Sequence, residues 1–193
     1  MLSSITPLGE RSRRQHFAIT ALFLLTGAAG AGAALGALLG ELGSQLPLSS
    51  AQRLAALGVA AALGLAGDLL LPQGVPTHLR QVDERWLHRY RGWVYGLGFG
   101  AQLGVAVATV VTTSAVYLTI LGEALAPSIL AGAVIGATFG GIRGASVLLA
   151  ARIDTPTSLL AFHRRLSTLE RPAWAVTLVG QAILVVVVMA VVL

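Results

Sequence analysis

The side chains of this sequence that could bind a small solute are amides and hydroxyls placed at helical spacing inside a long apolar segment. Gln102, Thr109, Thr113 and Tyr117 follow one another at intervals of seven, four and four residues. Because each residue turns a helix by about 100°, these side chains fall on one strip. Amides and hydroxyls are disfavoured against lipid tails, so the strip predicts a route or pocket for a small polar solute, with Gln181 as a further contributor.

Two ionisable side chains, Asp68 and Arg143, also lie within apolar segments. Charge inside a membrane span is costly and usually has a partner, so we expect the two to form an ion pair in the cytoplasmic half of the membrane. The alternative is that each side chain reaches the nearby cytoplasmic surface. Asp68 lies four residues before Pro72, where the span is expected to end, and for this residue both interpretations stand.

Residues suited to enzymatic chemistry are sparse. The chain has no Cys, which excludes disulfides, thiolate metal sites and thiol redox chemistry. Its four His show no metal-ligand spacing, and no nucleophile lies beside a base. The glycines at positions 96, 98 and 100 do not follow a strand, so they do not form a dinucleotide site. The sequence therefore predicts no enzyme, no metal and no cofactor.

The polar strip lies on residues 93–121, an uncharged stretch of 29 residues that is long enough to cross a bilayer as one helix. Gly96, Gly100 and Gly104 fall on another strip of the same helix. Small residues at this spacing let a neighbouring helix backbone approach closely. A helix with two such faces is expected in the middle of a bundle.

The composition places the whole chain in a membrane. Of its residues 55% are hydrophobic and 11% are charged, a balance that a water-soluble domain could not cover with polar surface. We therefore predict an all-α, multi-pass protein of the cell membrane, with residues 1–193 as a single transmembrane domain. Its five expected spans are residues 17–42, 51–71, 93–121, 126–151 and 174–193.

Two basic amphipathic segments, residues 78–91 and 152–171, predict helices that lie along the cytoplasmic surface of the membrane. In the first segment, Leu79, Val82, Trp86 and Tyr90 recur at three- and four-residue spacing. The alternative for this segment is a solvated connector docked on other parts of the protein.

Glycines at four-residue spacing predict which spans pack most tightly. The fourth span has an unbroken series: Gly132, Gly136, Gly140 and Gly144. The first span has a shorter one: Gly32, Gly36 and Gly40. The first, third and fourth spans are therefore expected to form the tight part of the bundle.

The distribution of arginine predicts the orientation. The net charge is +5 and all thirteen basic residues are Arg. The first 16 residues and the loops 73–92 and 152–171 hold 3, 4 and 4 of them, while the opposite connections hold none. This pattern is typical of membrane topology and not of nucleic-acid binding. It predicts a cytoplasmic N-terminus and a C-terminus outside the cell. The expected binding partners are the lipid bilayer and either a membrane-protein partner or a second copy of the chain.

Similar residues recur at a separation of 80, as in Arg11, Arg91 and Arg171, or Pro47 and Pro127. The matches predict a tandem duplication with units 11–90 and 91–170 and a final helix 172–193. Each unit would hold two spans, so both would share one orientation, related by an axis along the membrane normal.

A local family resemblance covers about thirty residues of the third span. The run GLGFGAQLG at residues 96–104, followed by TTSA at 112–115, resembles a core helix of the CcdA/DsbD-type transmembrane scaffold, a group similar to small-solute exporters. Members that relay reducing equivalents use membrane cysteines near a proline, and this chain has VTTS at the matching place, residues 111–114. The resemblance therefore implies no redox relay. The halves of that family resemble inverted three-span repeats, unlike the two-span units predicted here.

Two functions follow from these observations. In the first, the chain is a transporter-like bundle that binds or passes a small polar solute along the polar strip. In the second, it is an accessory or scaffold subunit of a membrane complex, without transport or catalysis of its own. A stoichiometric partner in the purified protein would favour the second.

Overall fold

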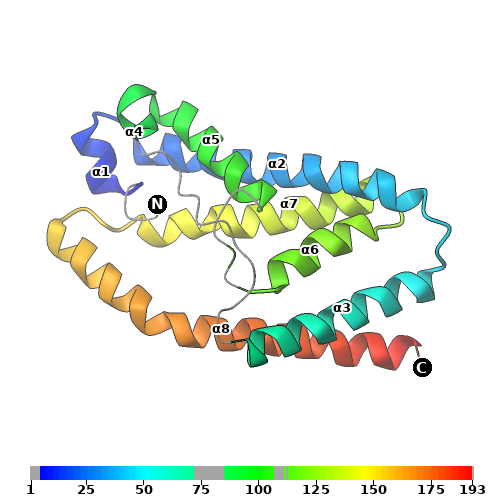
Figure 1. The fold of residues 1–193 in the computed structure, drawn as a ribbon. Helices are drawn as coiled ribbons and strands as arrows, with labels where there is room; N and C mark the ends of the chain where they lie inside the picture. Colours follow the sequence, from blue (N-terminus) through cyan, green and yellow to red (C-terminus); the bar gives the residue numbers. More distant parts are fainter. Residues whose placement is uncertain (1–4, 72–84, 107–110, 112, 193) are drawn as a thin grey trace.

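The computed structural model describes residues 5–71, 85–106, 111 and 113–192, and the regular secondary structure in these residues is helical. The helices are α1 (Pro7–Ser12), α2 (Phe17–Ser44), α3 (Ser50–Leu70), α4 (Trp86–Arg89), α5 (Gly92–Val105), α6 (Ala115–Ala124), α7 (Ile129–Ala145), the 3₁₀ helix η1 (Ser146–Ala150) and α8 (Pro156–Val192). Four segments are long and apolar enough to cross a membrane, namely α2, α3, α7 with η1, and α8. The protein is an elongated helical bundle (Figure 1).

The helices α2, α5 and α7 touch through their backbones. A Cβ atom placed on Gly136 of α7 would meet the carbonyl group of Gly32 in α2, 2.7 Å from the carbonyl carbon. The glycines of α5 and α7 whose Cβ would meet α2 are Gly96, Gly100, Gly104, Gly132, Gly136, Gly140 and Gly144. Close backbone approach of this kind is available only to residues without a side chain. These contacts, here called the glycine row, make α2 the centre of the tight part of the bundle.

The order of the contacts sets the direction of each helix. Gly96 and Gly104 of α5 meet Thr20 and Ala28 of α2, so α5 runs parallel to α2. Along α7 the order is reversed: Gly132 meets Gly36, and Gly140 meets Ala28. The helix α7 is therefore antiparallel to α2.

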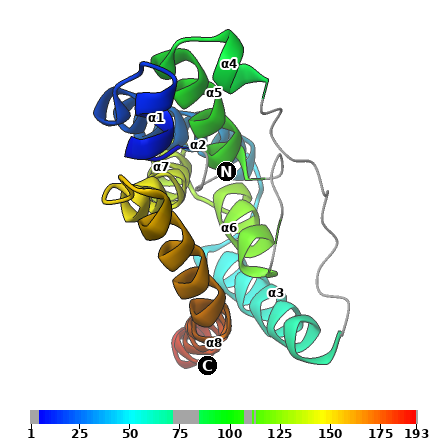
Figure 2. The ribbon, with the colours of Figure 1, turned by 90° about the vertical axis from the view of Figure 1, so that its left-hand side faces the viewer.

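The helices α3 and α8 form a second pair, and α6 lies between this pair and the α2–α5–α7 group (Figure 2). Gly58 of α3 leaves space for Val188 of α8, because a Cβ at Gly58 would lie 2.6 Å from the Val188 side chain. Gly64 of α3 does the same for the Ser114 hydroxyl, at 2.6 Å. These two glycines bring α3 against α8 on one side and against the start of α6 on the other.

The continuous helix predicted over residues 93–121 is wrong: the segment is interrupted, with α5 ending at Val105 and α6 beginning at Ala115. Ala106 has a φ of 64°, a left-handed conformation that ends α5. The sequence from 105 to 114, VAVATVVTTS, is rich in β-branched residues, which have low helix propensity. Length and apolarity predict that a segment enters the membrane, but they do not predict that it is helical throughout.

The interruption also bears on the predicted duplication. A shift of 80 residues would pair the continuous α2 with the interrupted α5–α6 segment. The two would then differ in structure at their centres, and the repeat stays a prediction.

The separate surface helix predicted at 152–171 is also wrong, because residues 156–192 form one helix, α8. Pro172 lies inside α8, and α8 bends along its length in Figure 1, as helices do at proline. Of the other predicted surface segment, residues 72–84 lie outside the described residues. Its described end is α4, where Trp86 stacks on Phe99 of α5 and Leu87 is buried.

Candidate functional site

A polar cluster occupies the place where the third span is interrupted. Asp68 of α3, Ser114 at the start of α6 and Gln181 of α8 come together there. The Ser114 backbone N–H donates to Asp68 Oδ1 at 3.0 Å and Oδ2 at 3.1 Å, and its hydroxyl donates to Oδ2 at 2.8 Å. Gln181 Nε2 donates to Asp68 Oδ2 at 3.1 Å and to the Ser114 hydroxyl at 3.0 Å. Three helices that are distant in sequence thus share one hydrogen-bond network.

The cluster lies near the middle of the length of the bundle. The C-terminal end of α5 lies at the middle of α2, since a Cβ at Gly104 would meet the backbone of Ala28 and Gly32. The C-terminal end of α6 lies at the end of α2, where a Cβ at Gly43 would meet Ala124. Figure 1 shows the C-terminal end of α3 and the start of α6 at the corresponding depth. The polar groups therefore lie among helices in which the neighbouring residues are mostly apolar.

The start of α6 accounts for the position of the Asp68 carboxylate. Backbone N–H groups at a helix N-terminus have no partner within the helix and carry a partial positive charge. Ser114 is the residue preceding α6, and its own side chain makes no capping bond to the α6 backbone. Asp68 supplies the missing acceptor from α3, so the carboxylate caps a helix to which it does not belong.

The predicted ion pair between Asp68 and Arg143 is wrong. Asp68 bonds to Ser114 and Gln181 instead, and it pairs with no cationic side chain in the described part of the chain. The Arg143 guanidinium lies over the ring of Phe139, one turn away on α7, at 5.3 Å from the ring centroid. The sequence predicted both charges in the cytoplasmic half of the membrane, but it did not predict which helices are neighbours there.

Gln181 has one atom without a partner. Its side chain is 4% exposed, and no donor in the described residues reaches its carbonyl oxygen Oε1. The orientation of the amide is set by the other end, because Nε2 uses both hydrogens on Asp68 and Ser114. A buried acceptor without a donor costs about 1–3 kcal/mol. A ligand that brought a donor to this oxygen would satisfy it.

An open groove of about 330 Å³ adjoins this amide. Its wall is mostly apolar and comes from four helices: Leu57 of α3, Leu118 of α6, Ile135 of α7 and Leu184 of α8. Gln181 itself lines the groove. Through Gln181, the groove adjoins the hydrogen-bonded cluster of Asp68, Ser114 and Gln181.

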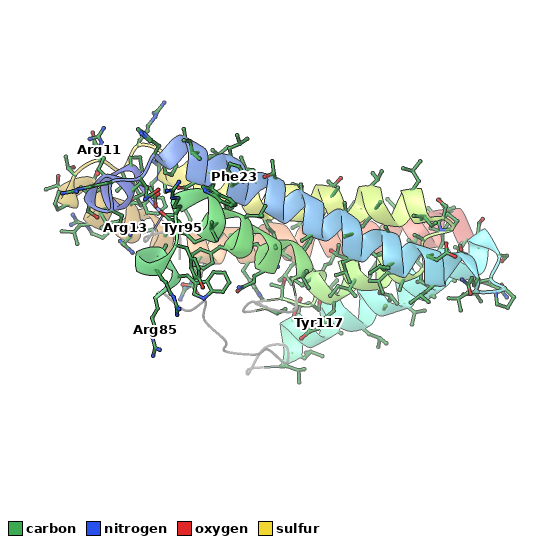
Figure 3. The ribbon with its side chains drawn as sticks, turned by 90° about the horizontal axis from the view of Figure 1, so that it is seen from above. Arg11, Arg13, Phe23, Arg85, Tyr95 and Tyr117 are labelled. Atoms are coloured by element: carbon green, nitrogen blue, oxygen red, sulfur yellow. The ribbon has the colours of Figure 1, made fainter. Side chains whose placement is uncertain are left out.

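The remaining residues predicted to line a solute route do not form one strip, because the helix that would align them is interrupted. Gln102 is half-buried on α5, and Thr113 is buried beside Ser114. Tyr117 on α6 is 40% exposed and lies near the middle of the molecule in Figure 3. Thr109 lies outside the described residues. Of the five, Gln181 belongs to the cluster at the break.

Ser114 was not among the predicted site residues. The sequence signal that could have marked it is the β-branched run that ends there, which disfavours a continuous helix. A residue with a short polar side chain at the end of such a run is a good candidate for the start of a new helix. Its partner Asp68 lies 46 positions away, so the pair itself could not be read from spacing.

A buried carboxylate, Glu10 of α1, holds the N-terminal end of the bundle together. Glu10 is fully buried and accepts hydrogen bonds from Arg13 at 2.6 Å, Thr20 at 2.7 Å and Tyr95 at 2.5 Å. Burial acts to lower the pKa of Arg13, but hydrogen bonds to Glu10 and Tyr95 outweigh it and leave that pKa raised. Arg13, Thr20 and Tyr95 all donate to the Glu10 carboxylate, so we regard this cluster as a structural contact between α1, α2 and α5.

Glu123, near the end of α6, is also a buried acidic residue. It is 2% exposed, and its Oε2 has no hydrogen-bond partner among the described residues. Its other oxygen lies against Gly136 in the glycine row. The described part of the chain holds no cluster of three His, Asp or Glu side chains that could bind a metal ion.

Comparison with models of known protein families, with curated proteins and with solved structures finds no match.

Proposed function

We propose that this chain is a transporter-like membrane protein whose solute-binding site is the cluster of Asp68, Ser114 and Gln181 at the start of α6. The observation that carries the proposal is the network of Asp68, Ser114 and Gln181 between apolar spans. An ionisable side chain at such depth is expensive to keep and commonly marks a binding site or pathway. Interrupted helices are used in transporters to expose helix ends and backbone groups to a solute near the bilayer midplane.

The proposed topology supports the same function. We infer five crossings from the four long apolar helices and the α5–α6 segment, and α5 runs parallel to α2 while α7 runs antiparallel to it. Arg11, Arg13 and Arg85 lie at one end of the molecule in Figure 3. Basic residues favour the cytoplasmic side, so we place this end and the N-terminus in the cytoplasm and the C-terminus outside. The start of α6 then lies between the two membrane surfaces (Figure 1).

Transport is tested by reconstituting the purified protein in liposomes and measuring uptake of radiolabelled glycerol, glycine and methylammonium. We expect saturable uptake of at least one probe above that of empty liposomes. Asp68→Asn should lower this uptake about ten- to hundredfold, the range for losing a hydrogen bond to a charged group. Asp154→Asn, the same change at an exposed residue, serves as the control. Equal uptake by both variants would overturn the proposal.

The second candidate, an accessory or scaffold subunit, is favoured by one observation. The first half of α8 is exposed and basic, with Arg164, Arg165 and Arg171 all accessible to a partner. Affinity purification of the full chain in mild detergent decides between the two. A stoichiometric second protein, with no uptake of any probe after reconstitution, would favour the subunit.

A further inference from the structure

The free oxygen of Gln181 restricts what can bind beside it. Oε1 is buried and lacks a donor within the described residues, while the amide nitrogen is held by Asp68 and Ser114. Rotating the amide would bring Oε1 against the Asp68 carboxylate, where two acceptors would face each other. A ligand at this place must therefore donate a hydrogen bond.

The charge of the cluster restricts the ligand further. The groups that bond to Asp68 are a backbone N–H, a hydroxyl and an amide, all of which are neutral. No cationic side chain of the described residues forms an ion pair with this carboxylate. A cation is the complement that such a site favours.

The groove decides between a bare metal ion and an organic cation. Metal ions such as Ca²⁺ and Mg²⁺ take six or more oxygen ligands, whereas the groove beside Gln181 is walled by Leu57, Leu118, Ile135 and Leu184. Its volume of about 330 Å³ falls in the range of small-molecule sites, which are mostly apolar with a few polar groups. An alkyl group would bury apolar surface there, while water or a hydrated ion would not.

We propose that the site binds a small organic cation, a protonated amine whose N–H donates to Gln181 Oε1 near the Asp68 carboxylate and whose apolar part lies in the groove. This inference rests on the proposed function, because it names the class of solute that the same site takes.

Isothermal titration of the full chain in detergent with four matched probes tests the inference. The probes are pentylammonium, pentyltrimethylammonium, 1-pentanol and methylammonium. We expect pentylammonium to bind most tightly. The trimethyl compound lacks the N–H, pentanol lacks the charge and methylammonium lacks the apolar part, and each should bind about tenfold more weakly or worse. Equal binding of pentylammonium and pentyltrimethylammonium would show that no hydrogen bond is made and would overturn the inference.

Two variants locate the binding. Gln181→Leu removes the free oxygen and should weaken pentylammonium binding about tenfold, whereas Gln45→Leu, the same change at an exposed residue, should leave it unchanged. Should Gln181→Leu fail to fold, Leu184→Trp narrows the groove with Gln181 in place and should also weaken binding about tenfold. Pentylammonium binding that neither folded variant changes would be partitioning into lipid or detergent and would overturn the inference.

The uptake assay separates this inference from the proposed function. Absence of pentylammonium binding, with Asp68-dependent uptake of glycerol or glycine, would refute the organic cation and leave the transport function standing. Uptake that is independent of Asp68 for every probe would refute the transport function itself.

Discussion

Two glycines in the same helix, Gly32 and Gly30 of α2, offer a matched test of the packing. A Cβ at Gly32 would meet the backbone of α7, 2.9 Å from the carbonyl carbon of Gly136 and 3.4 Å from the Cα of Gly140. A Cβ at Gly30 would meet nothing within 4 Å. Both Gly→Ala changes gain the same helix propensity, about 1 kcal/mol. Their difference therefore isolates the contact between α2 and α7.

The contact cost follows from which atoms are hit. Neighbouring side chains could rotate away, but a backbone can move only if the two helices separate. Overpacking of this kind costs about 1–3 kcal/mol. For a chain of this size, each kcal/mol shifts the midpoint of thermal unfolding by about 2–4 °C, so Gly32→Ala should unfold about 2–12 °C below Gly30→Ala.

Thermal unfolding in detergent, followed by circular dichroism and by the loss of monodisperse protein in size-exclusion chromatography, measures this difference. Gly30→Ala should unfold at or above the temperature of the unaltered protein. The same midpoint for both variants would mean that α2 and α7 are not in backbone contact, and the glycine row would then be an incorrect description of the bundle.

Three further substitutions test other contacts, two by the same unfolding measurement and one by proteolysis. Tyr95→Phe removes a hydrogen bond to the buried Glu10 carboxylate and should cost about 1–3 kcal/mol; an unchanged midpoint would show that α1 is not docked through Glu10. Arg53→Gln removes hydrogen bonds to the carbonyls of residues 46, 48, 125 and 126. It should speed proteolysis of the α2–α3 and α6–α7 connections, in which these carbonyls lie. Equal cleavage rates for the variant and the unaltered protein would contradict this expectation. Glu123→Gln removes an acid whose buried oxygen has no donor among the described residues, so the unfolding midpoint should stay unchanged or rise. A loss of more than about 1 kcal/mol in the free energy of unfolding would reveal a partner.

The helices that could be predicted from the sequence are those whose limits are set locally. The predicted span 17–42 corresponds to α2, and 51–71 corresponds to α3, which begins with a capping box between Ser49 and Gln52. Pro72 follows directly after α3 and its last cap residue. In each case an apolar run ends at residues whose own chemistry stops a helix, so the sequence carries the boundary.

The features that could not be predicted depend on contacts between distant residues. The start of α6 is stabilised by Asp68, from another helix, and no local pattern records that contact. The helix α1 belongs to a polar lead, yet Glu10 is buried because Thr20 and Tyr95 are brought to it. Apolarity alone predicts that residues 93–121 are embedded in the membrane. It is compatible with one continuous helix, and equally with two shorter helices whose terminal backbone groups find hydrogen-bond partners elsewhere in the protein.

The most direct test of the central claim is whether a water-soluble reagent reaches the break between α5 and α6. The chain has no Cys, so a single introduced thiol is the only one present. In reconstituted protein, Ser114→Cys should react with a membrane-impermeant methanethiosulfonate reagent, and pentylammonium should slow the reaction. Val186→Cys, at an exposed apolar position on α8, should stay unmodified because lipid covers it. Ser114→Cys that reacts as slowly as Val186→Cys would contradict a solute site at the break.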